Sequence, residues 1–182
     1  CATRFLQAAF NARDSFSPGT AAEIGSYFQR PYNPGEGFWP TERPLDSTFL
    51  TPHFKIWYTT AGRDAVPAED VAPHNGVPDY VDVMADAFEW SFEFEVRIMG
   101  FRRPLSDYWV PNNGGDERYD VFLFNAPFLG VTVAEWFDRV LPTSVTAAPY
   151  FGMNSRMYDF FGKEEGKRYL ETTVAHEFLH AS

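Results

Sequence analysis

Residues 176–180 read His-Glu-Phe-Leu-His, a pattern that can hold a divalent metal ion. On a helix, His176 and His180 are one turn apart, so their imidazoles project from the same face and can bind a single ion. Glu177 is rotated by about 100° around the helix, which suits a general base acting on a metal-bound water. Zinc lowers the pKa of its water and polarises an amide carbonyl, so the pattern indicates zinc-dependent peptide hydrolysis.

A catalytic zinc ion needs a third protein ligand, and the sequence does not visibly supply one. In the extended pattern HExxHxxGxxH, the Gly and the last His would lie beyond Ser182, as would a Glu from a later helix, so we expect this ligand beyond Ser182. The two other histidines are His53, at the start of an expected strand, and His74, in an expected loop, and we interpret both as structural. The competing interpretation of the motif is that His176 and His180 are ordinary surface or capping residues.

The residues around the motif predict a helix over 167–180. Leu170, Val174 and Phe178 fall on one side of it and are expected to anchor the helix to the core. Tyr169 and Thr173 fall on the side of the two histidines at the helical repeat. Polar and apolar side chains are therefore separated in the way that a metal site on a helix requires.

A second and longer helix is predicted over 78–99, with Pro78 at its first position. Two apolar stripes run along it at spacings of three and four, so we expect a sheet to cover one side and another helix the other. The stripes are Val81, Met84, Ala85, Phe88, Phe92, Val96 and Met99, and Val83, Ala87, Trp90, Phe94 and Ile98. Glu95 falls inside the first stripe and is expected to pair with Arg102 or Arg103, because an unpaired buried charge is costly.

Alternating or β-branched and aromatic segments predict strands over 53–60, 118–126 and, more weakly, 148–157. Strand, long helix, strands and helix in this order indicate an α+β fold rather than regular βαβ units. We interpret 1–50, where only 2–13 has the composition of a helix, as an irregular N-terminal extension or the remnant of a pro-segment. Residues 51–182 then form part of a catalytic domain.

The composition of the chain excludes further classes of partner and site. The 182 residues carry a net charge of −10, which argues against nucleic acid as a partner, and no apolar run is long enough to cross a membrane. A single cysteine excludes an internal disulfide framework, although Cys1 could be a lipidated residue. The loops before Gly76 and Gly115 each have only one of the three acidic or amide residues that an EF-hand needs before its Gly, which excludes an EF-hand and leaves an irregular calcium site open. Oligomeric state does not follow from the sequence.

The chain resembles a family of bacterial, secreted zinc metalloproteases of the zincin-like group. The segments that carry the resemblance are 53–67, 75–89, 100–107, 114–122 and 173–180. The resemblance implies that zinc is bound by His176 and His180, with Glu177 as the base. In that family a second His often stands where this chain has Trp57, and Phe often stands where it has Leu179.

The resemblance also implies a zincin-like fold, in which a twisted sheet packs on a long backing helix and an active-site helix. The chain would be the N-terminal part of a catalytic domain, and it would be truncated after the active-site helix. A protein or peptide is the implied substrate, and export from the cell, with possible anchoring at the surface, is the implied location.

An alternative function belongs to a different class. The missing third ligand and the tryptophans Trp39, Trp109 and Trp136 in loop-like regions are also compatible with a zincin-shaped binding or adhesion module that performs no hydrolysis. A third possibility is a zymogen in which residues 1–50 inhibit the enzyme. The zinc content separates the first two interpretations, and deletion of residues 1–50 tests the third.

Overall fold

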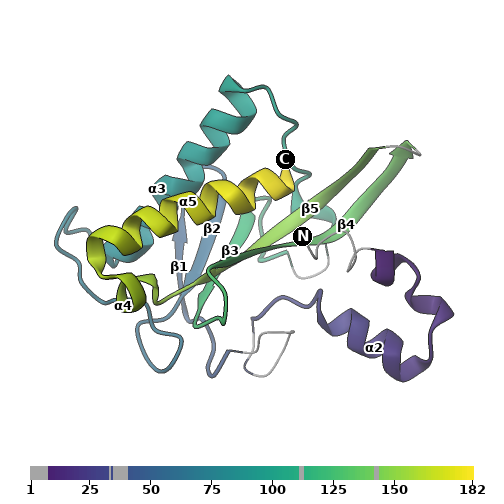
Figure 1. Cartoon of the computed structure of the whole chain (residues 1–182), viewed down its shortest axis with the longest axis horizontal. Helices are drawn as coiled ribbons and strands as arrows, with labels where there is room; N and C mark the ends of the chain where they lie inside the picture. Colours follow the sequence, from purple (N-terminus) through teal and green to yellow (C-terminus); the bar gives the residue numbers. More distant parts are fainter. Residues whose placement is uncertain (1–7, 33, 35–40, 111–112, 142–143) are drawn as a thin grey trace.

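The computed structural model describes residues 8–32, 34, 41–110, 113–141 and 144–182, except for the side chains of 136–147, and it confirms an α+β fold (Figure 1). The strands are β1 (Ser47–Leu50), β2 (Phe54–Tyr58), β3 (Tyr119–Phe124), β4 (Gly130–Leu141) and β5 (Ser144–Asn154). The helices are α2 (Pro18–Ser26), α3 (Asp79–Ser91), α4 (Met157–Phe161) and α5 (Lys163–Ala181), with the π-helix η2 (Phe92–Ile98) and the 3-10 helices η1 (Arg13–Ser15) and η3 (Asp107–Trp109).

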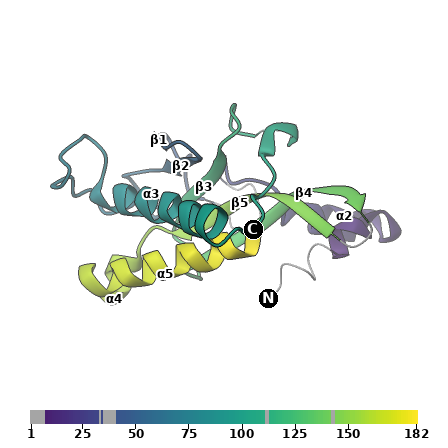
Figure 2. The same ribbon diagram turned by 90° about the horizontal axis from the view of Figure 1, so that it is seen from above.

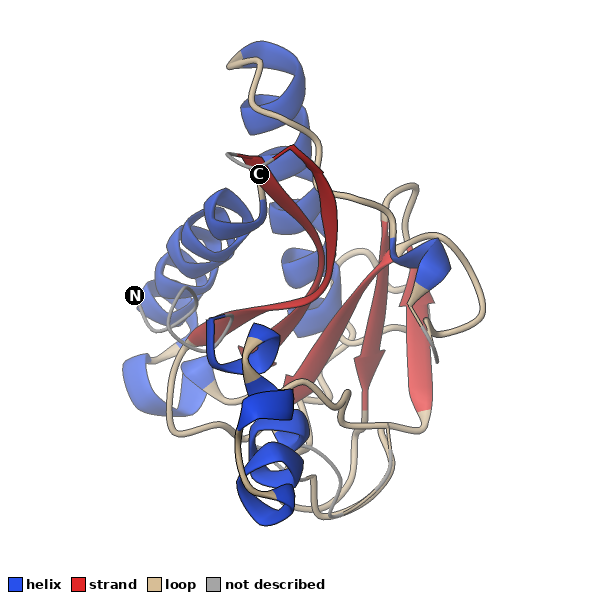
Figure 3. Ribbon diagram, turned by 90° about the vertical axis from the view of Figure 1, so that its right-hand side faces the viewer, coloured by secondary structure: helices blue, strands red, loops and turns tan. Residues whose placement is uncertain are grey.

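The five strands form one mixed sheet in the order β1-β2-β3-β5-β4. β2, β3 and β5 are parallel neighbours, whereas β1 and β4 run antiparallel to β2 and β5. β4 and β5 form a long hairpin that extends well beyond the shorter strands, and the sheet as a whole is twisted (Figures 1 and 3). β4 is therefore an edge strand, and its register against β5 is fixed by a long antiparallel ladder.

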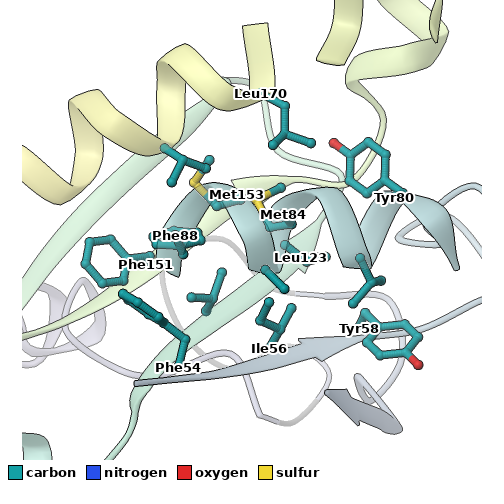
Figure 4. Close-up of a cluster of buried hydrophobic side chains, with 14 of the residues drawn as sticks. Phe54, Ile56, Tyr58, Tyr80, Met84, Phe88, Leu123, Phe151, Met153 and Leu170 are labelled. Atoms are coloured by element: carbon teal, nitrogen blue, oxygen red, sulfur yellow. The ribbon is translucent and has the colours of Figure 1, made fainter. Parts of the chain in front are cut away.

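The two long helices, α3 and α5, lie on the same side of the sheet, which we call the front face (Figure 2). Side chains that alternate along β2 and β3 point into the core between sheet and helices, as the period of two predicts (Figure 4). Members of this core that are fully buried include Phe54, Ile56, Val121, Leu123, Met84, Phe88, Leu170 and Phe178. The predicted anchors of the last helix, Leu170, Val174 and Phe178, are thus confirmed.

The opposite side, which we call the back face, is covered by N-terminal residues. Phe28, Tyr32 and Leu45 pack there against Phe122 and Phe124. α2 lies on the other side of the β4–β5 hairpin from α5 (Figure 1). The described N-terminal residues therefore pack away from the helix that carries the histidines.

The prediction for the long helix is confirmed in its extent and wrong in part of its packing. α3 and η2 are continuous over Asp79–Ile98, and Pro78 precedes the first helical residue. The second apolar stripe is not covered along its whole length, because Trp90 and Ile98 are 62% and 67% exposed. The physical reason is that α5 packs beside α3 on the front face instead of opposite the sheet, so it covers only the start of this stripe.

The structure also contains helices and strands that the sequence pattern did not predict. α2 was missed because Pro18 and Gly19 suggested a turn, although Ser17 accepts a hydrogen bond from the backbone N–H of Thr20 and caps the helix. β1 and β4 were also missed, and the predicted strand 148–157 ends at Asn154. Residues 8–11 are helical, and the rest of the predicted helix before them lies outside the described residues.

No helix within the described ranges is both long and apolar enough to cross a membrane.

Candidate metal centre

The two imidazoles of the motif converge on the exposed side of α5. The Nε2 atoms of His176 and His180 are 3.0 Å apart, the ring centroids are separated by 4.6 Å, and the ring planes are at 87° to each other. Two nitrogens that bind one zinc ion tetrahedrally at normal bond lengths lie about 3.3 Å apart. The spacing of the two nitrogens is therefore close to that of two ligands of one ion, and both histidines are exposed to solvent.

The helix is held in this orientation by the core beneath it. Phe178 is fully buried, and its ring centroid lies 5.9 Å from that of Phe54, 5.9 Å from that of Phe92 and 6.2 Å from that of Phe151. Aromatic pairs at these separations stabilise a core beyond their buried area. Since Phe178 lies between the two histidines in sequence, its packing directs both imidazoles away from the core.

Glu177 lies between the side of the helix that bears the imidazoles and the edge strand β4. It is buried, at 7% exposure, and the Thr132 hydroxyl oxygen is 2.8 Å from its carboxylate Oε2 and 2.6 Å from its main-chain oxygen. The close approach of strand and helix depends on Gly130, because a Cβ atom there would lie only 2.8 Å from the Cγ of Glu177 and 2.7 Å from the Cγ2 of Thr173. The carboxylate is thus held against β4 and does not belong to the imidazole pair.

A third ligand is not assembled by the described residues. His53 is paired through Nδ1 with Glu89 Oε2 at 2.7 Å and stacks on Phe92, and His74 contacts the carbonyl oxygen of Asp70 at 2.7 Å. Over the described ranges, no group of three or more His, Cys, Asp or Glu side chains is arranged to hold a metal ion. The expectation of a third ligand beyond Ser182 stays a prediction.

Glu95 has a different environment from the one predicted. Its carboxylate accepts a hydrogen bond from the Ser182 hydroxyl at 3.3 Å, whereas Arg103 donates to the hydroxyl of Tyr119 and lies over the ring of Phe92. Burial raises the pKa of Glu95, and the Ser182 hydrogen bond partly opposes that shift. The predicted pairing with Arg103 is therefore wrong, because that guanidinium points toward the sheet, and the structure shows the Ser182 hydroxyl as a partner of Glu95.

Of the three tryptophans that suggested a binding or adhesion module, only Trp109 has a described side chain. Trp109 is 70% exposed and packs edge-on against Tyr108, which is itself 54% exposed. Trp39 and the side chain of Trp136 lie outside the described residues.

A second charged cluster lies on the back face, and the sequence analysis did not find it. The buried guanidinium of Arg30 is 3.0 Å from Asp107 Oδ2 and 2.6 Å from Glu135 Oε2, and it also bonds to Asp120. Burial raises the pKa of Asp107 and Glu135 to about 7 and that of Asp120 to about 6, although Arg30 opposes each shift. No spacing rule could have found a cluster whose members are so far apart in sequence.

Trp57 belongs to this back-face cluster. Its indole Nε1 donates to Asp120 Oδ1 at 2.6 Å, and its ring lies under the Lys55 ammonium at 4.7 Å. Successive residues of a strand point to opposite faces, so Trp57 points away from the face on which α5 lies. Trp57 therefore lies on the opposite face of the sheet from the imidazole pair.

Comparisons of the chain with protein-family models, with curated proteins and with solved structures found no match.

Proposed function

We propose that this chain carries the zinc-binding helix of a zinc-dependent endopeptidase with a zincin-like catalytic domain. The observation that carries the proposal is the convergence of two exposed imidazole nitrogens, 3.0 Å apart, next to a buried carboxylate on the same helix. The fold adds support, because a mixed sheet with an antiparallel edge strand packs on a long helix and on the helix that bears the motif.

In this proposal the residues have separate roles. His176 and His180 hold the metal ion through Nε2, in neutral form. Zinc supplies an activated water and polarises the substrate carbonyl when it is bound. Glu177 accepts the proton of the attacking water and passes it to the leaving amine. Two imidazoles fit the donor preference of zinc, and a third ligand completes the set.

The edge strand supports a peptide as the substrate. β4 is the last strand in the sheet order and lies directly beside Glu177 through Thr132. An extended peptide can add to such an edge by main-chain hydrogen bonds, which would bring its carbonyl groups alongside α5. The resemblance to secreted metalloproteases is the only basis for proposing that the protein is secreted and anchored at the cell surface.

The proposal is tested on the protein in the full length that its gene encodes, purified free of other proteases. We expect one tightly bound zinc ion per chain, cleavage of casein, and loss of cleavage on chelation. Glu177→Gln is expected to keep the zinc ion and to lose at least about 100-fold in activity, because the general base is gone. Glu171→Gln is the matched control, since Glu171 is exposed on the same helix and pairs only weakly with Lys167. Normal proteolysis by the Glu177→Gln protein would overturn the mechanism.

The second candidate is the non-catalytic binding module. It is favoured because the described residues bring no third His, Cys, Asp or Glu side chain to the imidazole pair, and because Tyr108 and Trp109 are exposed. Absence of zinc from the full-length protein, together with absence of cleavage, would favour this candidate over the peptidase.

A further inference from the structure

Thr132 on the edge strand β4 touches the carboxylate that the proposed function uses as its base. We propose that Thr132 is a positioning residue that fixes the Glu177 carboxylate for catalysis, and this inference rests on the proposed function. Thr132 is 4% exposed, and its hydroxyl is within hydrogen-bond distance of both Glu177 Oε2, at 2.8 Å, and the main-chain oxygen of Glu177, at 2.6 Å. The described structure gives no other hydrogen bond to this carboxylate.

The placement of Thr132 follows from the strand register. β4 pairs with β5 so that Gly130 lies opposite Met153 and Thr132 lies opposite Phe151. Phe151 is fully buried and stacks on Phe178, the residue after Glu177. The same ladder therefore sets the position of the hydroxyl on β4 and of the aromatic contact that fixes α5. A one-residue slip would turn Thr132 to the back face.

The Thr132 hydroxyl can form hydrogen bonds that an apolar side chain of the same shape cannot form. When it donates to Oε2, it restricts the rotamer of Glu177 and leaves Oε1 free of this hydrogen bond. The hydroxyl has a single proton, so it donates to Oε2 or to the main-chain oxygen of Glu177, and either hydrogen bond ties Glu177 to β4.

The test compares Thr132→Val, which removes the hydroxyl at nearly constant shape, with Thr132→Ser, which keeps it. For Thr132→Val we expect kcat to fall by about 10- to 100-fold, because misplacement of a catalytic group has effects of this size. KM and zinc stoichiometry should stay unchanged, and Thr132→Ser should recover most of the lost kcat. Thr172→Val is the control, since the Thr172 hydroxyl bonds only to the carbonyl oxygen of Arg168 on the exposed side of α5.

A crystal structure of the metal-free Thr132→Val protein gives a readout that does not depend on activity. We expect the Glu177 carboxylate to leave the position that it occupies beside β4. An unmoved carboxylate, or a Thr132→Ser protein as impaired as Thr132→Val, would overturn the positioning role even if the wild-type protein is a zinc peptidase. If the wild-type protein shows no cleavage, the proposed function fails, and the crystal structure alone decides whether Thr132 holds Glu177.

Discussion

Substitution of Arg30 tests which interactions hold the N-terminal residues to the sheet. Its side chain is 3% exposed and bonds to three carboxylates, Asp107, Asp120 and Glu135, which are themselves at most 7% exposed. The perturbation is Arg30→Met, which keeps much of the side-chain length and removes the charge and the hydrogen-bond donors. Three buried carboxylates then remain without their cation.

The magnitude follows from the burial of the cluster. Removing one partner of a buried ion pair costs about 3–5 kcal/mol, because the remaining charge is left uncompensated. The carboxyl groups can reduce this cost by taking up protons, since burial already raises the pKa of Asp107 and Glu135 to about 7. We therefore expect the full loss near pH 8 and a clearly smaller loss near pH 5.

The assay is urea unfolding followed by tryptophan fluorescence, with Trp57 as a reporter inside the cluster. Arg156→Met is the control, because Arg156 makes a 2.6 Å pair with Asp159 but both side chains are more than 40% exposed, at 43% and 47%. Exposed pairs of this kind contribute less than about 1 kcal/mol. If Arg30→Met and Arg156→Met lower the free energy of unfolding equally at pH 8, the reasoning about the cluster is refuted.

Two further predictions concern the same strand and the same cluster. A carboxyl whose pKa is raised by folding, as that of Asp107 is to about 7, makes the folded state bind more protons than the unfolded state. The contribution of Asp107 to stability is therefore present at about pH 4 and is lost as the pH rises to about 7. Over this range, urea midpoints should fall less steeply with pH in Asp107→Asn than in the wild type. An equal slope would contradict the raised pKa of Asp107. Gly130→Ala should lower the free energy of unfolding by about 1–3 kcal/mol, because the new methyl group would overlap Glu177 and Thr173. Gly25→Ala, with nothing within 4 Å of the added Cβ, is the control, and equal unfolding curves for both variants would show that β4 is not packed so closely.

The elements that the sequence predicted best are those with a strong local period. α5 and α3 have apolar residues at spacings of three and four, and β2 alternates cleanly, so Phe54 and Ile56 point to the front face and Trp57 to the back. The convergence of His176 and His180 also follows from helical spacing alone. These features need no knowledge of the rest of the chain.

The parts that were missed depend on partners distant in sequence. β4 alternates poorly because residues on both of its faces are buried, Thr132 against α5 and Val133 on the back face. Arg30 was not recognised because Glu135 lies 105 residues away in the sequence. Glu95 was assigned to the wrong partner because the end of α5, which brings Ser182 to it, arrives from the other end of the chain.

The contact between Thr132 and Glu177 and the cluster around Arg30 involve the same strand, β4. Thr132 points from β4 to Glu177 on the front face, and Glu135, at the bulge between Ala134 and Trp136, turns to Arg30 on the back face. Because Glu135 is only three positions after Thr132, Arg30 stabilises the same stretch of strand that places the Thr132 hydroxyl. We therefore expect Arg30→Met, at a pH where the protein stays folded, to weaken the contact between Thr132 and Glu177 without touching either residue. Faster hydrogen exchange of the β4 amides would report this loosening, and unchanged exchange in β4 would mean that the two faces of the sheet are independent.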